Sequence, residues 1–244
     1  MEKKKTDVRI TQLNKEILKE LSNIKPKAYN RAKRIFPYIE DWMTGKDYPT
    51  YDELAELSKI FKIPFGYFFL KELPKYNPPI PISNAIEHED LIDTIKLAEE
   101  IQDWAKDFLT ELGWKKTDFD FSKVKISKSS NLQSLIDEIE KNGIFVLILK
   151  GIEEYAGFVL YDDMAPVITI NSANTIEEKI NTLIDAVEYV ADKKSGIIDR
   201  KINSITNNEE IYISRRFLQL IDSAVSMGII TYVDAMRIVR FDDY

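Results

Sequence analysis

A cluster of short apolar segments in the second half of the chain sets its fold class. A helix is expected over residues 132–141, where Asn142-Gly143 ends it. Three runs with the length of strands follow, at residues 144–149, 156–161 and 167–170. The next segment is an amphipathic helix that carries Thr182-Leu183 and Asp185. A helix, a small three-stranded sheet and a second helix predict a compact α+β unit.

The helix around Asp185 carries no histidine, so it cannot hold zinc in the way that the H-E-x-x-H helix of a zinc peptidase does. Such a helix needs two imidazoles at positions i and i+4, with a glutamate between them as general base. Asp185 and Tyr189 keep this spacing without the imidazoles, and Ala186 cannot take up a proton. The 244 residues include one His, His88, and no Cys. No catalytic residue, metal ion or cofactor is therefore predicted, although the many carboxylates leave a hard cation such as magnesium as an alternative.

The first 70 residues contain short helical segments punctuated by Pro and Gly. Thr50-Tyr51-Asp52-Glu53 is a capping box, and the helix after it carries Leu54, Leu57 and Phe61 on one face. Pro26, Pro37 and Pro64 suit the first turns of other helices. Helices are expected over residues 11–21, 27–33, 37–43, 50–61 and 64–70. An all-α, five-helix domain is therefore predicted ahead of the α+β unit.

The order of these residues resembles the XRE type of helix-turn-helix domain in repressors that are fused to an ImmA/IrrE metallopeptidase-like domain. In the N-terminal region the resemblance is carried by Trp42-Met43-Thr44-Gly45, Pro49-Thr50, Leu54-Ala55, Lys62-Ile63-Pro64 and Phe68-Phe69-Leu70. In the body it is carried by Asn142-Gly143-Ile144-Phe145-Val146, Gly157-Phe158-Val159-Leu160-Tyr161 and, near the end, residues 228–235. The sequence departs from the family where Met43 replaces the usual Glu and where Asp185-Ala186-Val187-Glu188-Tyr189 replaces H-E-x-x-H. The resemblance therefore implies a zincin-like fold that is catalytically dead.

A helix-turn-helix domain implies contacts with double-stranded DNA. In that fold the third helix enters the major groove and its first residues read base edges. Arg34, Tyr38 and Glu40 are the candidate base-contacting residues, and Phe36 could touch a thymine methyl group. Trp42 is expected in the core, with a DNA contact as the alternative. The candidate phosphate contacts are Lys25, Lys27, Arg31, Lys33 and Arg34.

Charge is unevenly distributed along the chain, whose net charge is −7. Residues 1–76 carry 16 Lys and Arg against 11 Asp and Glu, whereas the remainder carries 18 against 30. The basic end favours an anionic partner, and a solvated lysine-rich surface is the alternative. Sequence-specific DNA binding, weak non-specific binding and a repurposed protein-binding domain all remain open.

Four regions are predicted: a helix-turn-helix domain (residues 1–73), a proline-rich linker (74–86), a pseudo-peptidase domain (87–208) and a C-terminal helix pair (209–244). A long amphipathic helix over residues 87–112 offers an apolar stripe that is either a core face or a dimer seam. Residues 192–208 are expected to be a link that leads into a helix over residues 210–227, with Glu209 and Glu210 as charges at its start. Thr231 to Asp234 form a second capping box.

These observations predict a cytoplasmic, homodimeric DNA-binding regulator of prokaryotic or mobile-element type. Its inactive peptidase-like domain would serve dimerisation or bind a signal or partner. The alternative is a protein-interaction factor, such as an antitoxin, anti-repressor or phage-defence component, that does not bind DNA. The absence of Cys fits a reducing compartment. The first residues lead into no apolar segment, so no signal peptide is expected. The longest apolar runs, residues 144–149 and 63–70, are far shorter than the roughly 20 residues of a membrane span, so none is expected.

Overall fold

The computed structural model describes residues 8–82, 87–124, 126, 131–152, 155–199 and 210–239. The chain divides into two compact units. The first contains Met1–Asn77 and Asn84–Glu89, and the second contains Pro78–Ser83 and Asp90–Asp242. Ile80, in the proline-rich segment, is buried in the core of the second unit, so this part of the segment is packed. None of the helices in the described ranges combines the length and apolarity that crossing a bilayer requires.

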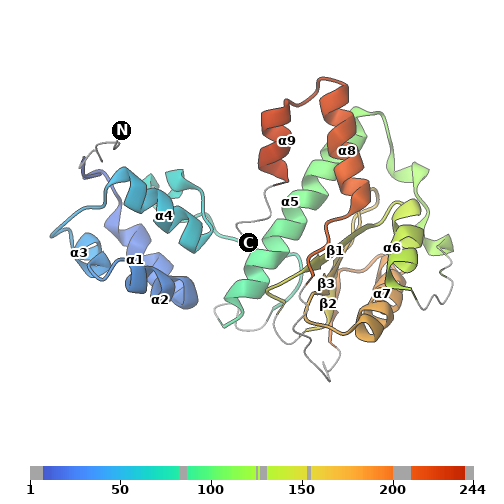
Figure 1. Cartoon of the computed structure of the whole chain (residues 1–244), viewed down its shortest axis with the longest axis horizontal. Coiled ribbons are helices and arrows are strands. Elements are labelled where there is room, and N and C mark those ends of the chain that lie inside the picture. Colours follow the sequence, from blue (N-terminus) through green and yellow to red (C-terminus); the bar gives the residue numbers. More distant parts are fainter. Residues whose placement is uncertain are drawn as a thin grey trace. The chain divides into compact units, whose positions relative to one another are not determined.

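The first unit is a helical domain with one apolar core (Figure 1). Its described elements are α1 (Lys15–Ile24), α2 (Pro26–Ile35), α3 (Ile39–Thr44), α4 (Tyr51–Phe61) and a 3-10 turn, η1 (Phe65–Phe69). Trp42 is fully buried in this core, which confirms its predicted place. Phe36 is also buried and its ring lies 5.4 Å from that of Trp42, so the suggested contact of Phe36 with a thymine methyl group is wrong.

Local capping explains where these helices begin and end. The predicted capping box of Thr50 and Glu53 is present at the start of α4. α1 begins at Lys15, later than predicted, because the side chain of Asn14 accepts the N–H of Glu16 and so caps the helix there. Gly45 ends α3 with a φ of +76°, a backbone conformation that glycine adopts at little cost. The fifth predicted helix is instead the 3-10 turn η1.

The second unit is built on a mixed sheet, which makes the protein α+β. The sheet has the order β1-β3-β2-β4 and contains β1 (Phe145–Leu149), β2 (Gly157–Leu160), β3 (Val167–Asn171) and β4 (Gly196–Ile198). β1 and β3 are parallel, and β2 pairs antiparallel with both β3 and β4. The prediction of three strands is therefore wrong. β4 lies in the stretch expected to be a link, and its three residues are too few to show a strand pattern.

Helices cover both faces of this sheet (Figure 1). On one face lie α5 (Glu89–Glu111), α8 (Arg215–Ser226) and α9 (Tyr232–Ile238), packed against Phe145, Leu147 and Phe158. On the other lie α6 (Leu132–Lys141) and α7 (Ile176–Ala191), packed against Val146 and Ile168. The strands are buried on both faces and consequently read as continuous apolar runs. The apolar stripe of α5 is core, as favoured, and two 3-10 turns, η2 (Lys116–Asp118) and η3 (Phe121–Lys123), follow it.

The helix expected over residues 210–227 begins only at Arg215, so that prediction is corrected. Ser214 caps α8 by accepting the N–H of Phe217. Just before it, Tyr212 forms an antiparallel bridge with Ile148 on the outer edge of β1. Because Tyr212 is hydrogen-bonded to the edge strand, the chain around it is extended and the helix cannot begin before Ser214. Glu210 precedes α8 outside any helix, while Glu209 and the predicted link over residues 200–208 lie outside the described residues.

Candidate functional site

The positions that would hold the peptidase motif lie in the middle of α7. Thr175 and Glu178 form a capping box that starts the helix. Ala186 is fully buried against the sheet, whereas Asp185 and Tyr189 are half-buried. The ring of Tyr189 lies against β4, since a Cβ atom built on Gly196 would be 2.8 Å from its Cε1 atom. Tyr189 is therefore a packing residue for the sheet edge.

No group of three or more His, Cys, Asp or Glu side chains with the geometry of a metal site occurs among the residues whose positions are described. Asp185 and Tyr189, four residues apart on one side of α7, do not supply the two imidazoles that the zinc motif requires.

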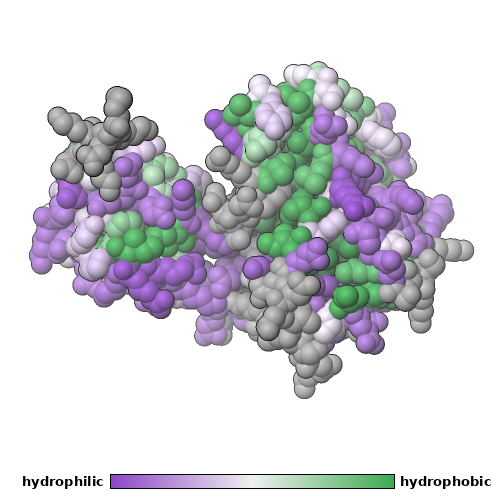
Figure 2. All heavy atoms as spheres, viewed as in Figure 1, coloured by the Kyte–Doolittle hydropathy of each residue, from purple (hydrophilic) through white to green (hydrophobic). Residues whose placement is uncertain are grey.

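The predicted phosphate-contacting residues lie on and beside α2. Lys27, Arg31 and Arg34 are exposed, and their spacing puts them on one side of the helix. Lys33 is exposed on a different side of the helix. Lys25 is only 5% exposed, so its side chain has little surface to offer a phosphate. Figure 2 shows hydrophilic residues covering the part of the first unit that contains α2.

A carboxylate already occupies the N-terminus of α2. Glu89, which belongs to the first unit, accepts the N–H of Lys27 at 2.9 Å and that of Ala28 at 3.2 Å. Its Oε1 atom also lies 3.9 Å from a guanidinium nitrogen of Arg31. The first residues of α2 have no side-chain cap of their own, so Glu89 supplies the acceptor that the helix end requires. An anion approaching this end of α2 would compete with Glu89.

The predicted base-contacting residues form hydrogen bonds inside the first unit. Tyr38 donates its hydroxyl to Glu53 at 2.9 Å, which raises the pKa of Tyr38. Lys33 donates to Glu40 at 2.5 Å, and this bond raises the pKa of Lys33 and lowers that of Glu40. The Lys33–Glu40 pair is exposed, so it adds little to stability. Arg34, at the end of α2, is exposed.

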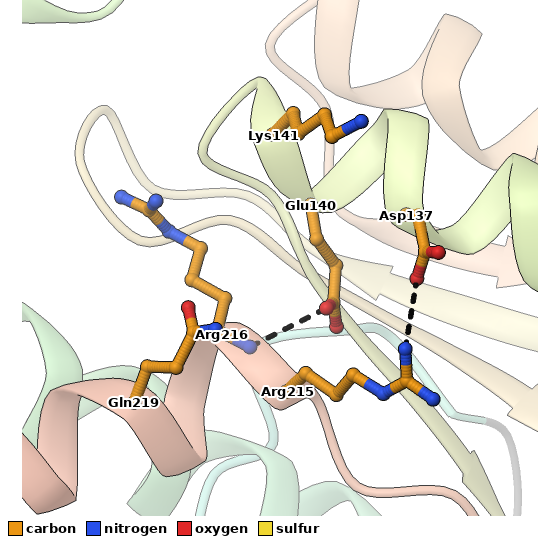
Figure 3. Close-up of a pocket in the computed structure, with 6 residues that line it drawn as sticks. All are labelled: Asp137, Glu140, Lys141, Arg215, Arg216 and Gln219. Atoms are coloured by element: carbon orange, nitrogen blue, oxygen red, sulfur yellow. Dashed lines mark hydrogen bonds and ion pairs between the residues drawn. The ribbon is translucent and has the colours of Figure 1, made fainter.

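A pocket of about 360 Å³ lies between the end of α6 and the start of α8 in the second unit (Figure 3). Its lining residues are Asp137, Glu140, Lys141, Arg215, Arg216 and Gln219. Arg215 lies 3.5 Å from Asp137, and both are largely exposed. Glu140, by contrast, is 6% exposed and projects from α6 toward the first turn of α8.

Glu140 joins three elements. Its Oε2 atom accepts the N–H of Arg216 at 3.3 Å and the hydroxyl of Tyr212 at 3.2 Å. Burial raises the pKa of Glu140, and nearby donors, beginning with Ser214, partly offset that effect. Burial likewise lowers the pKa of Arg216, whose guanidinium lies 5.4 Å from the ring centre of Phe145. The pocket thus combines a buried carboxylate with a half-buried guanidinium.

The sequence contained one signal for this pocket. Glu140 lies on the apolar face of α6, four residues after Ile136, where a charged side chain is unusual. Arg215 and Arg216 occupy the first turn of α8, where the helix dipole disfavours cations, but the sequence placed the start of this helix at residue 210. The sequence also did not indicate that Glu140 and Arg216 meet, because they lie 76 residues apart.

Comparisons with family models, with curated proteins and with solved structures found no match to this chain.

Proposed function

We propose that this protein is a DNA-binding transcriptional regulator of prokaryotic or mobile-element type, and that the basic residues of α2 supply the phosphate contacts when its first unit binds double-stranded DNA. The observation that carries the proposal is the exposed row of Lys27, Arg31 and Arg34 along one side of that helix. Lys33 adds a further exposed cation on a different side of α2. Such side chains neutralise phosphates and release counterions, which gives binding that weakens steeply with salt.

Phosphate contacts dominate this proposed interface. Tyr38 is hydrogen-bonded to Glu53, and Glu40 is hydrogen-bonded to Lys33. To contact a base, each side chain would have to break its present hydrogen bond. Arg34 is the better candidate for a base contact, because an arginine can bond two atoms of a guanine edge. We therefore expect a large non-specific component of affinity and a modest preference for sequence.

The second unit acts in this proposal as a binding body without hydrolytic activity. Asp185, Ala186 and Tyr189 supply neither the two histidine ligands nor the glutamate general base of the H-E-x-x-H motif. Peptide-hydrolysis assays and elemental analysis of the purified protein test this directly. Cleavage together with stoichiometric zinc would contradict it.

A second copy of the chain is the proposed partner of the second unit. The apolar side chains that α9 and the preceding turn expose are Met227, Ile229, Tyr232, Val233 and Met236. Figure 2 shows hydrophobic residues over α8 and α9 on the face in view. A two-fold contact between these surfaces would bury them in both copies. A dimer would also present two DNA-binding units, as paired half-sites require.

One observation favours a protein-interaction factor that does not touch DNA. Glu89 fills the anion-binding end of α2 and shares Arg31, while Glu40 pairs with Lys33. Internal carboxylates thus neutralise part of the surface that phosphates would need.

Fluorescence anisotropy with the protein's own promoter DNA, measured across a salt series, separates the two functions. If Lys27, Arg31, Lys33 and Arg34 each contact a phosphate, the plot of log affinity against log salt should have a slope of about −3.6. The double variant Lys27→Gln/Arg34→Gln should reduce this slope by about 1.8. Lys71→Gln, an exposed lysine outside α2, is the matched control and should leave it unchanged. No binding at low salt would refute the DNA-binding proposal.

A further inference from the structure

The pocket between α6 and α8 holds cations and buried polar atoms in one small volume. Lys141 and Arg215 are exposed at its edge, whereas Glu140 lies buried within it. A volume of about 360 Å³ falls in the range of small-molecule sites. In Figure 3, the carboxylate of Glu140 lies between the side chains of Arg215 and Arg216, which leave α8 in different directions.

Two buried atoms of the lining have no hydrogen-bond partner among the described residues. They are Oε1 of Glu140, an acceptor, and Nε of Arg216, a donor. Buried polar atoms are normally paired, because leaving one unpaired costs about 1–3 kcal/mol. The other carboxylate oxygen of Glu140 accepts the N–H of Arg216 and the Tyr212 hydroxyl, and the Ser214 hydroxyl and the Val146 N–H also lie near this carboxylate. The first turn of α8 is therefore already capped, and Oε1 of Glu140 and Nε of Arg216 retain hydrogen-bonding capacity that a ligand could use.

We propose that this pocket binds a small phosphate ester that carries hydroxyl groups, that is, a sugar phosphate or a nucleotide. The phosphate would bind Lys141 and Arg215 at the edge of the pocket. A hydroxyl would donate to Oε1 of Glu140, and an oxygen of the ligand would accept from Nε of Arg216. This inference does not depend on the proposed DNA binding, because every residue involved belongs to the second unit.

Charge and hydrogen-bonding groups favour a phosphate ester over a simple carboxylate. The lining contains three cations and two carboxylates, of which Asp137 is paired with Arg215. A phosphate ester carries nearly two negative charges and several acceptor oxygens, so it can engage an arginine and a lysine together. A buried carboxylate with an unpaired oxygen requires a donor, which the fully ionised phosphate group of an ester does not supply and a sugar hydroxyl does. The same chemistry occurs in a free sugar phosphate and in a nucleotide.

Isothermal titration calorimetry on the full chain tests the proposal with four probes: ribose 5-phosphate, adenosine 5′-monophosphate, ribose and inorganic phosphate. We expect one or both of the first two to bind at least about tenfold more tightly than ribose or phosphate. A preference between ribose 5-phosphate and the nucleotide identifies the source of the ligand. Arg215→Gln should weaken binding of the preferred probe by about tenfold, since a charge-assisted hydrogen bond is lost.

Arg237→Gln is the matched control. Arg237 is also an exposed arginine paired with an aspartate, at 3.7 Å from Asp234, but it lies on α9 outside the pocket lining. This variant should bind as the wild type does. Glu140→Gln should reduce the preference for ribose 5-phosphate over inorganic phosphate, and circular dichroism verifies that it folds. If Glu140→Gln does not fold, Arg215→Gln and the probe series still decide the matter.

Three results would overturn the proposal. The first is no binding of either phosphate ester at about 10 mM. The second is equal affinity for ribose 5-phosphate and inorganic phosphate, which would mean that no hydroxyl is recognised. The third is equal loss of binding in Arg215→Gln and Arg237→Gln, which would mean that the anion responds only to overall charge.

Discussion

Replacing Gly157 by alanine would test the pairing on which the second unit depends. Gly157 lies opposite Ile170 in the antiparallel register of β2 and β3. A Cβ atom at this position would be 2.4 Å from the backbone oxygen of Thr169 and 3.3 Å from Cγ2 of Thr182 on α7. The first distance is about 1 Å shorter than an ordinary van der Waals contact. Because the oxygen belongs to a central strand, it cannot move without disturbing both neighbouring strands.

The expected cost follows from two opposing contributions. Overpacking a tight site costs about 1–3 kcal/mol. Alanine also restricts the unfolded chain more than glycine does, which returns about 0.4–1 kcal/mol. We expect a net loss of about 1.3 kcal/mol in the free energy of unfolding of the second unit. For a unit of this size, that loss lowers the melting temperature by about 3–5 °C.

Urea unfolding followed by circular dichroism measures this loss, and the slope of the transition shows whether unfolding remains cooperative. Gly66→Ala is the control, because nothing lies within 4 Å of a Cβ atom there. It should leave stability unchanged or raise it by about 0.5 kcal/mol. A Gly157→Ala protein as stable as the wild type would refute the register of β2 against β3 and the packing of α7 on it.

Three further outcomes are expected. Burial raises the pKa of Glu140 above its ordinary 4.5, so its contribution to stability is full at low pH and is lost as pH rises through the raised pKa. As pH increases from 4.5, the free energy of unfolding of the uncharged variant Glu140→Gln should therefore rise relative to that of the wild type. A difference that stays constant with pH would contradict this. Thr50→Ala removes the side-chain cap of α4 and should cost the first unit about 1 kcal/mol in thermal unfolding, whereas no change would mean that the cap contributes nothing. Tyr232→Lys, at a side chain that is 71% exposed, should shift the protein toward monomer in sedimentation without lowering its melting temperature. A dimer that persists would exclude the α9 surface.

Helix ends were predictable because the interactions that set them are local. The capping boxes of Thr50 with Glu53 and of Thr231 with Asp234 span three residues and appear as predicted. Gly113 follows α5 with a φ of +84°, again as the sequence indicated. The start of α8 was mispredicted because a bridge to β1, far away in the chain, holds the residues before Ser214.

The candidate sites were predictable only in part. The residue types on α2 indicated a basic surface, and Lys27, Arg31 and Arg34 are exposed there. The sequence did not show that Lys25 is buried or that Glu89 bonds to the start of the helix, because both depend on how separate segments pack. The pocket around Glu140 was not predicted either, because it forms between segments that are distant in the chain.

The sequence by itself determined the α+β class, most helix boundaries and the lack of imidazole or thiolate side chains on α7. These properties follow from composition and from interactions within a few residues. Only the tertiary structure decided the strand order, the fourth strand and the meeting of Glu140 with Arg216. Such contacts join residues that are distant in the chain, and their stability comes from burial and hydrogen bonds that form only once the whole unit has folded.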